Sequence, residues 1–553
     1  MIEVTDRSGL ARAGKWMTEQ TVIKFPNVVY SDTASFSAPP AADLRASWNE
    51  GLVISNSGLQ LSKFCGDIHT PFDRKSEGEP ILDGDVAILD NSFELKRDAR
   101  AFSDSIVSLR SKIGYNKLIF APGLMEPSNL ALLAYCGIDL FDNSRVLYET
   151  AKGFALLTSG TYKASDLGIA QEDLLERNMT EVLNELALVR HMISLGRLRE
   201  LVETRVNASA WAVASLRLLD LEHYAFQERF TSVTGPNFCC NSKASLMRPD
   251  VRRFRERVME RWEPPKHKKI LLMIPCSAKK PYYTSKSHRL FEEVLLSVPN
   301  SCAIQELIIT SPLGTVPREF ETFYPASQYD IPVTGNWDLE EIDMIQKLVR
   351  HAASFGFEKV ICNLGSESEF VQEVVDCIDT SEGNSATSPE ALSRLREVLM
   401  EECQNVEKVP RALDRIEMVR SMCKYQFGKE GSALLDNASV VGKYPYLKIM
   451  RDGVQLGMLT PERGMISLTL EGAEVLSQLN LNVIEIGDFD LTGSLFSVGI
   501  VSADERIRPG DEVVIRRNGE LAGAGVSLMS GSEMADSRRG EAVKVRHKIK
   551  KKQ

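Results

Sequence analysis

Fifteen residues, "IPCSAKKPYYTSKSH" at 274–288, gather several side chains that can do chemistry. Cys276 supplies a thiol, and Lys280, Tyr282 and His288 supply groups that can carry protons. A neighbouring lysine favours the thiolate, which is the nucleophilic form of cysteine. The spacing therefore predicts nucleophilic catalysis by Cys276. The alternative is a buried core cysteine beside two solvated lysines.

The elements around this loop follow from hydrophobic patterning. The apolar run "KILLMI" at 269–274 predicts a buried strand, and "SHRLFEEVLLSV" at 287–298 predicts an amphipathic helix with Ser287 as its N-cap. Cys276 then lies where the strand ends. Parallel α/β sheets bind their ligands at the carboxyl ends of strands, so the pattern places Cys276 at a binding edge.

Two further runs predict neighbouring strands, "QELIIT" at 305–310 and "KVICNL" at 359–364. If the sheet is parallel, the residues that follow these strands share an edge with Cys276. The carboxylates of Asp330 and Glu319 could bind the ammonium group of an amino-acid substrate; each acidic residue is otherwise a surface residue or a helix cap. The secondary candidates are Ser311, Asn363, Glu367, Glu319 and Asp330.

Composition predicts a multidomain cytoplasmic protein. The chain has 553 residues, too many for one core, and carries a net charge of -10. It contains no uncharged apolar run long enough to span a membrane and no signal-peptide core at its start. Its ten cysteines show no C-x-x-C spacing, which argues against a disulfide framework or a zinc ribbon.

The order of strand-like and helix-like segments predicts an α/β multidomain fold. Alternating apolar strands and amphipathic helices fill the first part, and the proline-containing linker "RWEPPKHKK" at 261–269 ends it. The last 75 or so residues read as short strands with turn signals, typical of a small β-barrel. We therefore divide the chain into four expected domains: 1–260, 265–382, 390–481 (small, α+β) and 482–553.

The C-terminal segment is basic although the whole chain is acidic. Residues 493–553 contain 12 Lys or Arg against 8 Asp or Glu, a net charge of +4, which leaves -14 for the rest. Clustered cations serve to neutralise phosphates. This segment is either a nucleic-acid contact or a solvated tail.

The loop at 274–288 also resembles a known signature. Pro275-Cys276, Lys280-Pro281-Tyr282, Ser285 and His288 keep the spacing of the archaeosine synthase family, and the stretch at 311–337 resembles a second block of that family. The resemblance implies catalytic roles for Cys276, Lys280, Tyr282, Ser285 and His288. It also implies addition of an amine, lysine in the family, to the nitrile of 7-cyano-7-deazaguanine (preQ0) in the tRNA D-loop, at nucleotide 15 in the family.

A nitrile can be activated by a cysteine. A thiolate that attacks the nitrile carbon gives a thioimidate, which an amine then displaces. The alternative is direct attack by the amine, with Cys276 only packing. Either route needs a proton for the nitrile nitrogen and a group that takes one from the amine.

Two other segments are similar to tRNA-modifying proteins. Residues 121–145 resemble part of the TIM-barrel-like domain of tRNA-guanine transglycosylases, with Asp142 where that family keeps its nucleophile. Residues 493–547 resemble a PUA domain, an RNA-binding β-barrel. The resemblance implies RNA contacts for Arg538, Arg539, Lys544 and Arg546.

The chain departs from the transglycosylase pattern at its metal site. Where transglycosylases hold zinc with cysteines and a histidine, residues 159–179 contain no cysteine, and Arg177 stands in the histidine's place. Cys239 and Cys240 are adjacent and lack a nearby histidine, which makes them poor zinc ligands. We therefore expect no metal and no cofactor.

The resemblance also implies partners. The family product is a lysine adduct whose conversion needs radical chemistry, and the chain has no C-x-x-x-C-x-x-C motif for an iron–sulfur cluster, so we expect a separate radical-SAM protein. A homodimer is also possible from the family. Two other functions stay open: base exchange, as in a transglycosylase, and a tRNA-binding scaffold without catalysis.

Overall fold

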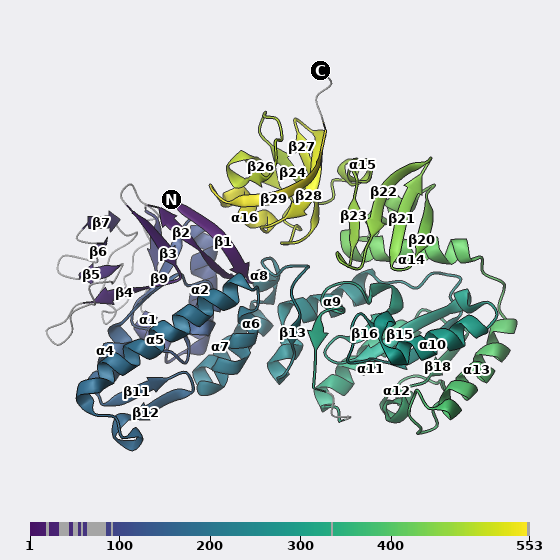
Figure 1. The fold of residues 1–553 in the computed structure, drawn as a ribbon, viewed down its shortest axis with the longest axis horizontal. Helices are drawn as coiled ribbons and strands as arrows, with labels where there is room; N and C mark the ends of the chain where they lie inside the picture. Colours follow the sequence, from purple (N-terminus) through teal and green to yellow (C-terminus); the bar gives the residue numbers. More distant parts are fainter. Residues whose placement is uncertain are drawn as a thin grey trace. The chain divides into compact units, whose positions relative to one another are not determined.

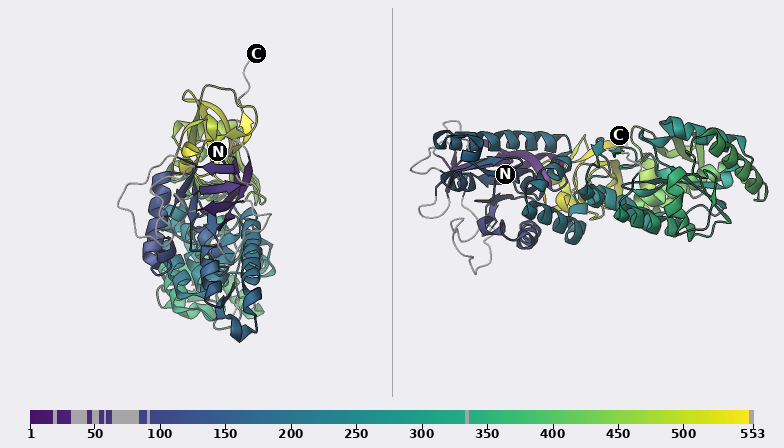
Figure 2. Two further views of the ribbon diagram at one scale, coloured as in Figure 1. Left: turned by 90° about the vertical axis from the view of Figure 1, so that its left-hand side faces the viewer. Right: turned by 90° about the horizontal axis from the view of Figure 1, so that it is seen from below.

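The computed structural model describes residues 1–17, 21–31, 44–47, 53–56, 59–62, 84–89, 92–332 and 336–549 (Figures 1 and 2). The chain forms two compact units. Unit 1 comprises 1–232, 494–509 and 528–543, and unit 2 comprises 233–493, 510–527 and 544–553. No helix of the described residues is long and apolar enough to cross a membrane.

Two sheets lie near the start of unit 1. Strands β1 (Ile2–Ser8), β2 (Ala11–Met17) and β3 (Val22–Phe25) form an antiparallel sheet. The second sheet has seven strands in the order β7-β6-β5-β4-β10-β9-β8. Their bounds are β4 Asn27–Ser31, β5 Arg45–Ser47, β6 Val53–Asn56, β7 Leu59–Ser62, β8 Val86–Ile88, β9 Leu118–Ala121 and β10 Leu140–Asp142.

The seven-stranded sheet is only partly of the expected kind. Strands β4, β10, β9 and β8 run parallel, as the α/β prediction requires. Beyond β5 the chain adds the antiparallel strands β6 and β7 rather than further strand–helix repeats. The strands that the structure describes therefore form an open sheet, whereas the expected TIM-barrel-like domain implied a closed ring.

Helices make up most of the rest of unit 1. The longest, α5 (Gln171–Ser194), packs on β1 and β2. A short hairpin of β11 (Phe154–Leu157) and β12 (Gly160–Lys163) precedes it. The other helices are α1 Ser92–Leu95, α2 Ala99–Ile113, α3 Leu130–Tyr135, α4 Ser144–Ala151, α6 Leu198–Arg205, α7 Ala210–Glu222 and α8 Tyr224–Glu228.

Unit 2 is built on a five-stranded sheet in the order β16-β15-β14-β18-β19. The run "ILLMI" is fully buried and becomes the central strand, because β14 (Ile270–Pro275) has parallel partners on both sides. The other strands are β15 Ile304–Thr310, β16 Gly314–Pro317, β18 Lys359–Cys362 and β19 Ile378–Asp379. The accompanying helices are α9 Pro249–Arg261, α10 Lys286–Ser297, α11 Leu339–Ala353, α12 Ser368–Gln372 and α13 Pro389–Gln404.

An α+β segment follows in the same unit. Helix α14 (Arg411–Phe427) and helix α15 (Leu470–Gln478) accompany a four-stranded antiparallel sheet. Its strands are β20 Ser439–Lys443, β21 Tyr446–Arg451, β22 Val454–Leu459 and β23 Ile466–Leu468. A two-stranded parallel pair, β13 (Phe238–Cys239) with β17 (Tyr329–Asp330), also belongs to unit 2.

The C-terminal residues are rich in strands, as predicted, and contribute to both units. Unit 2 contains β24 (Val483–Ile486), β27 (Glu512–Arg517) and β28 (Glu520–Ser527). Unit 1 contains β25 (Leu495–Phe496), β26 (Ile500–Ala503) and α16 (Gly531–Asp536). The last strand, β29 (Glu541–Lys548), begins in unit 1 and ends in unit 2.

Candidate active site

Cys276 lies at the carboxyl edge of the central sheet, as the sequence predicts. Its backbone N–H donates to the Ile309 carbonyl at 3.1 Å, which continues the pairing of β14 with β15 by one residue. Strand β18 flanks β14 on the other side in parallel. The loops that follow the three strands therefore meet at one edge of the sheet.

A chain of buried hydroxyl groups leads to the Cys276 thiol. The Tyr282 and Tyr329 hydroxyls are 2.6 Å apart, and the Tyr329 hydroxyl also hydrogen-bonds Thr310. Thr310 in turn hydrogen-bonds the Cys276 side chain. These contacts connect the loop after β14, the end of β15 and β17 into one network that can move a proton to or from sulfur.

Lys280 adds an amine to this network. Its Nζ atom lies 3.9 Å from the centre of the Tyr329 ring and is buried without a hydrogen-bond partner. Burial lowers the pKa of Lys280, and the nearby Cys276 and Asp330 oppose that shift. A lysine with a lowered pKa holds part of its population as a neutral amine, which can accept a proton.

Burial opposes the thiolate that the sequence predicts for Cys276. Burial raises the pKa of Cys276, and the hydrogen bond from Thr310 and the charge of Lys280 offset only part of the shift. The side chain is half-buried among apolar residues. Cys276 therefore needs a base before it can act as a nucleophile.

Ser285 and His288 organise the loop from its helical side. Helix α10 begins at Lys286, and Ser285 is its N-cap, accepting a hydrogen bond from the His288 N–H at 3.2 Å. The prediction of Ser287 as the cap is wrong by two residues. The Ser285 hydroxyl thus satisfies a backbone donor of the helix.

His288 is a buried, neutral side chain. It is 2% exposed, stacks on Tyr282 with ring centres 5.2 Å apart, and accepts a hydrogen bond at Nδ1 from Arg318 at 2.9 Å. Burial and the Arg318 charge lower the pKa of His288 to about 2. The ring therefore supports Tyr282, and it stays uncharged at neutral pH.

Three secondary candidates lie at or near the predicted edge. Ser311 directly follows β15 and donates to Glu341. Asn363 follows β18, but its amide is already used, donating to Ala386 and accepting from Thr380. Asp330 is exposed and electrostatically coupled to Lys280. The structure therefore brings Ser311 and Asp330 near the site, and gives Asn363 a structural role.

Glu319 does not belong to this site. It is 4% exposed and accepts hydrogen bonds from Trp262 and Gln305, each at 2.9 Å. Gln305 is at the beginning of β15, and Cys276 is beside the end of that strand. The expectation that Glu319 binds a substrate ammonium is wrong, because its carboxylate is a buried hydrogen-bond hub at the opposite end of the sheet.

Glu367 has the least satisfied carboxyl group near Cys276. Its Oε2 atom is buried without a hydrogen-bond partner, and Trp337 hydrogen-bonds the carboxyl group. Burial raises the pKa of Glu367 to about 7. The sequence pointed to Glu367 only by its place after β18, whereas Thr310 and Tyr329 carried no signal of their own.

Asp142 belongs to unit 1. It ends β10, is fully buried, and accepts hydrogen bonds from the Gly123 N–H at 2.5 Å and from Ser144. Burial raises the pKa of Asp142 to about 6. Asp142 is therefore a buried carboxyl group with two hydrogen-bond partners inside unit 1, and its substrate-binding role stays a prediction.

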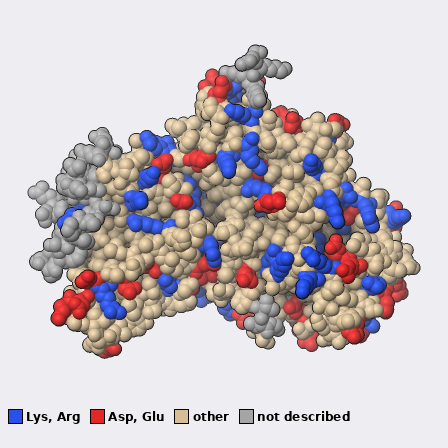
Figure 3. Space-filling model, viewed as in Figure 1, with Lys and Arg blue, Asp and Glu red and all other residues tan. Residues whose placement is uncertain are grey.

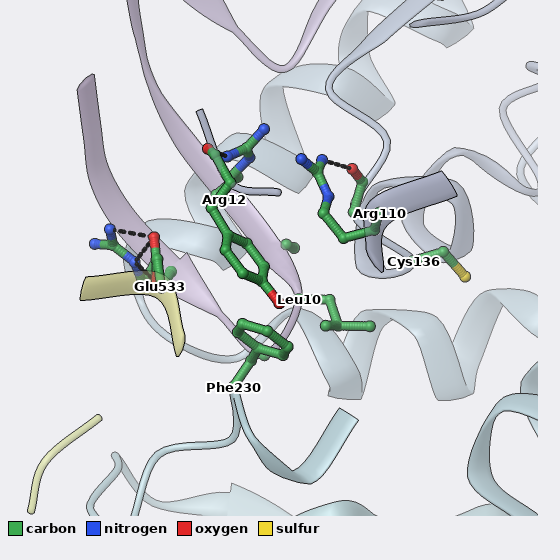
Figure 4. Close-up of a pocket in the computed structure, with 11 residues that line it drawn as sticks. Leu10, Arg12, Arg110, Cys136, Phe230 and Glu533 are labelled. Carbon is green, nitrogen blue, oxygen red and sulfur yellow. Dashed lines mark hydrogen bonds and ion pairs between the residues drawn. The ribbon is translucent and has the colours of Figure 1, made fainter. Parts of the chain in front are cut away.

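Unit 1 also contains a small cavity lined by charged residues (Figure 4). Its volume is about 20 Å³, enough for one or two water molecules. The arginines around it are already paired: Arg12 and Arg110 both bind Asp139, and Arg7 binds Glu533 at 2.7 Å. The cavity is therefore part of the packing of unit 1 rather than a substrate site.

The expected RNA-contacting residues differ in their availability. The side chains of Arg538, Arg539 and Lys544 are exposed. Arg546 is exposed as well, but it pairs with the buried Glu512 and donates to Ser467 at 3.2 Å, so its charge already has a partner in unit 2. Lys and Arg side chains are interspersed with acidic residues over the face shown in Figure 3.

Metal ligands do not gather among the residues that the structure describes: no group of three or more His, Cys, Asp or Glu side chains could hold an ion there. Arg177 is exposed on α5. Cys239 lies on β13, and the next residue, Cys240, is buried.

Comparisons with known proteins cover most of the chain. A model described as a domain of unknown function (DUF5591) matches residues 251–399, and a PUA domain model matches 490–549. The archaeosine synthase subunit alpha of Methanosarcina acetivorans is 34% identical over 516 residues, covering 86% of this chain and 81% of the relative. The protein of that name from Thermococcus kodakarensis is 35% identical over 485 residues, covering 84% and 81%. A tRNA-guanine(15) transglycosylase from Methanobrevibacter smithii is 25% identical over 570 residues, covering 93% and 79%.

Proposed function

The chain belongs to the archaeosine synthase family, and we propose that it modifies tRNA in archaeosine biosynthesis by adding an amine to a nitrile-bearing base. The observation that carries this proposal is the convergence on Cys276 of a hydroxyl chain and an amine without a partner. A cysteine that only packs in a core would need neither the hydroxyl chain nor the amine beside it. The preQ0 nitrile in tRNA is the electrophile, and lysine is the amine donor.

The first step joins the base to the enzyme. Lys280 takes the proton of the Cys276 thiol, the sulfur attacks the nitrile carbon, and one carbon–nitrogen π bond breaks as the carbon–sulfur bond forms. The nitrile nitrogen then receives a proton from the protonated Lys280 or through Thr310 and Tyr329. The low pKa of Lys280 supports its role as the base, and the raised pKa of Cys276 explains why a base is needed.

The second step releases the product. The amine attacks the thioimidate carbon, the carbon–sulfur bond breaks, and the sulfur leaves with its electron pair. The outcome is an amidine-type adduct without cleavage of the glycosidic bond. Ser285 and His288 act on this chemistry indirectly, since they fix the start of α10 and the position of Tyr282.

The other expected domains serve tRNA binding and maturation. We assign the chemistry to residues 265–382 and tRNA positioning to residues 482–553, within which the PUA match lies. The name "subunit alpha" describes the Methanosarcina relative as one part of a larger enzyme. We propose that this chain also works with a second protein, a radical-SAM enzyme that acts on the lysine adduct.

Base exchange is the second candidate function, because transglycosylases are among the relatives. It would use Asp142 as nucleophile, and the buried contacts of that residue speak against it. A non-catalytic tRNA-binding scaffold would not require the hydroxyl chain and the amine that surround Cys276.

Nucleoside mass spectrometry separates these functions. Pure protein is incubated with preQ0-tRNA and labelled lysine. We expect a mass gain of one lysine with no release of base, and complete loss of product for Cys276→Ser with tRNA affinity unchanged. Release of free preQ0 would indicate base exchange. Full turnover by Cys276→Ser would rule out covalent catalysis.

A further inference from the structure

Glu367 lies at the same edge of the central sheet as Cys276. Met273 on β14 pairs with Cys362 on β18, and three residues beyond each of them stand Cys276 and Gly365. Glu367 follows two residues later and is electrostatically coupled to Cys276. The carboxyl group thus belongs to the same edge of the sheet as the thiol.

The carboxyl group of Glu367 is held in place but only half satisfied. Trp337 hydrogen-bonds it, and the Trp337 ring packs on Phe370 with ring centres 5.6 Å apart. The Oε2 atom is buried and has no hydrogen-bond partner, and none of the ion pairs among the described residues includes Glu367. Buried carboxyl oxygens are almost always hydrogen-bonded, so an exception at a reactive site calls for a ligand.

Lys280 does not fill this role from within the protein. Its Nζ atom lies over the Tyr329 ring and also lacks a hydrogen-bond partner, which it would have if it reached Glu367. The site therefore holds an amine and a carboxyl group that do not pair with each other. Because Lys280 does not pair with Glu367, the carboxyl group can instead bind the ammonium group of a ligand.

Resting on the proposed function, we propose that Glu367 binds the ammonium group of the attacking amine and removes its proton. The ammonium fills the vacant position at Oε2 as a charge-assisted hydrogen bond. One N–H proton passes to the carboxylate, and the nitrogen lone pair then forms the bond to the carbon held on Cys276. The carbon–sulfur bond breaks next, and no oxidant or reductant is needed.

A division of labour follows. Lys280 and the hydroxyl chain handle the proton of Cys276 and the nitrile nitrogen, whereas Glu367 handles the proton of the amine. A base is essential there, because an alkylammonium has no lone pair with which to attack.

The test compares Glu367→Gln with Glu369→Gln in the full-length protein. Gln keeps the shape of the side chain but cannot accept a proton. Glu369 is exposed and only two residues away, which makes it a matched control. We expect Glu367→Gln to raise the KM for lysine at least tenfold and to lower kcat, with an unchanged KM for preQ0-tRNA. Glu369→Gln should behave like the wild type.

A second amine isolates the proton transfer. Hydroxylamine is already unprotonated at neutral pH, so Glu367→Gln should lose far less activity with hydroxylamine than with lysine. Equal losses with both amines, equal changes in both KM values, or wild-type kinetics would overturn the proposal.

Failure of the proposed function would look different. If the wild type adds neither amine to preQ0-tRNA, the proposed function fails. The amine subsite is then judged by calorimetry of lysine binding to the protein alone. At least tenfold weaker binding to Glu367→Gln than to the wild type supports it, and equal binding overturns it.

Discussion

The Tyr329 hydroxyl lies in the middle of the hydroxyl chain. It bonds Tyr282 on one side and Thr310 on the other, Thr310 also hydrogen-bonds Tyr282, and Thr310 reaches the Cys276 thiol. Removing this one oxygen should therefore slow proton movement along the chain while leaving the thiol in place.

We predict that Tyr329→Phe lowers the rate of amine addition on the order of a hundredfold, the usual scale for losing acid–base assistance. The ring beneath Lys280 remains, so tRNA affinity should not change. Single-turnover measurements test this prediction. The control is Tyr283→Phe, because the Tyr283 ring contacts Tyr444 and lies outside the hydroxyl chain. Equal rates for wild type and Tyr329→Phe would remove the relay from the mechanism.

His288 should make the protein sensitive to acid. Its pKa falls from 6.5 to about 2 on folding. Below pH 6.5 the unfolded chain therefore binds a proton at His288 and the folded chain does not, which favours the unfolded state. Stability from this group is fully present above pH 6.5 and falls by about 1.4 kcal/mol per pH unit below it. His288→Asn keeps an acceptor for Arg318 and does not titrate.

Urea unfolding at pH 7.5 and pH 5.5 checks this prediction. The wild type should lose more stability than His288→Asn between the two conditions, by about 1.4 kcal/mol for the one unit below 6.5. The same loss in both proteins would show that His288 does not set this slope.

Sequence patterns identified the residues of the site that lie in one loop or just after a strand. Cys276 and Lys280 share the first loop, and Glu367 follows a predicted strand. Thr310 and Tyr329 remained hidden because their roles come from strand register and from β17, which the pattern of a two-residue strand cannot reveal. Glu319 looked available because sequence does not report which carboxylates a core has already paired.

At the scale of elements, the turn from β15 into β16 depends on Gly314. Its φ is +77°, and a Cβ atom there would lie 2.2 Å from Leu348 Cδ1 on α11. Only glycine combines this backbone with so close a helix. Thr310 pairs directly with Gly314, so the turn also supports the hydroxyl chain.

We predict that Gly314→Ala lowers the free energy of unfolding by roughly 2–4 kcal/mol, through backbone strain and crowding against α11. Gly356→Ala is the matched control, because Gly356 has a similar φ of +78° with nothing within 4 Å of its Cβ position. It should cost only about 1 kcal/mol. Denaturant titration of both variants tests the difference; equal effects would mean that α11 yields to the added methyl group.

Strands with a strong local apolar pattern could be predicted from the sequence. Whether the strands of a sheet close into a barrel could not. The buried runs that became β14 and β15 lie where apolar runs predicted strands. Among the described residues the seven-stranded sheet of unit 1 is open where a ring was expected. Strands β5, β6 and β7 have only three or four residues each, and short segments carry little periodicity.

At the scale of the whole molecule, RNA binding depends on which basic side chains are not already in an ion pair, more than on their number. Arg538 and Arg539 are exposed, whereas Arg546 is committed to Glu512. The four basic residues expected to contact RNA should therefore not be equivalent.

We predict that the double variant Arg538→Glu/Arg539→Glu raises the Kd for tRNA about tenfold and flattens its salt dependence by roughly two counterions, if each side chain meets one phosphate. Arg546→Ala should instead lower stability, because it leaves Glu512 buried without this partner. Filter binding at several salt concentrations and thermal unfolding separate the two effects. An unchanged salt slope in the double variant would assign RNA binding elsewhere.

The division of the C-terminal residues between both units has a consequence for how the chain is made. Residues 494–509 and 528–543 complete unit 1, and residues 510–527 and 544–553 complete unit 2. A ribosome synthesises these residues after the rest of both units, so neither unit can finish folding before they emerge. The ion pair of Arg7 with Glu533 joins residues 526 positions apart, and such distant contacts form slowly. Premature termination near residue 490 would thus leave two unfinished bodies instead of one missing module, and the cell's proteases would meet both.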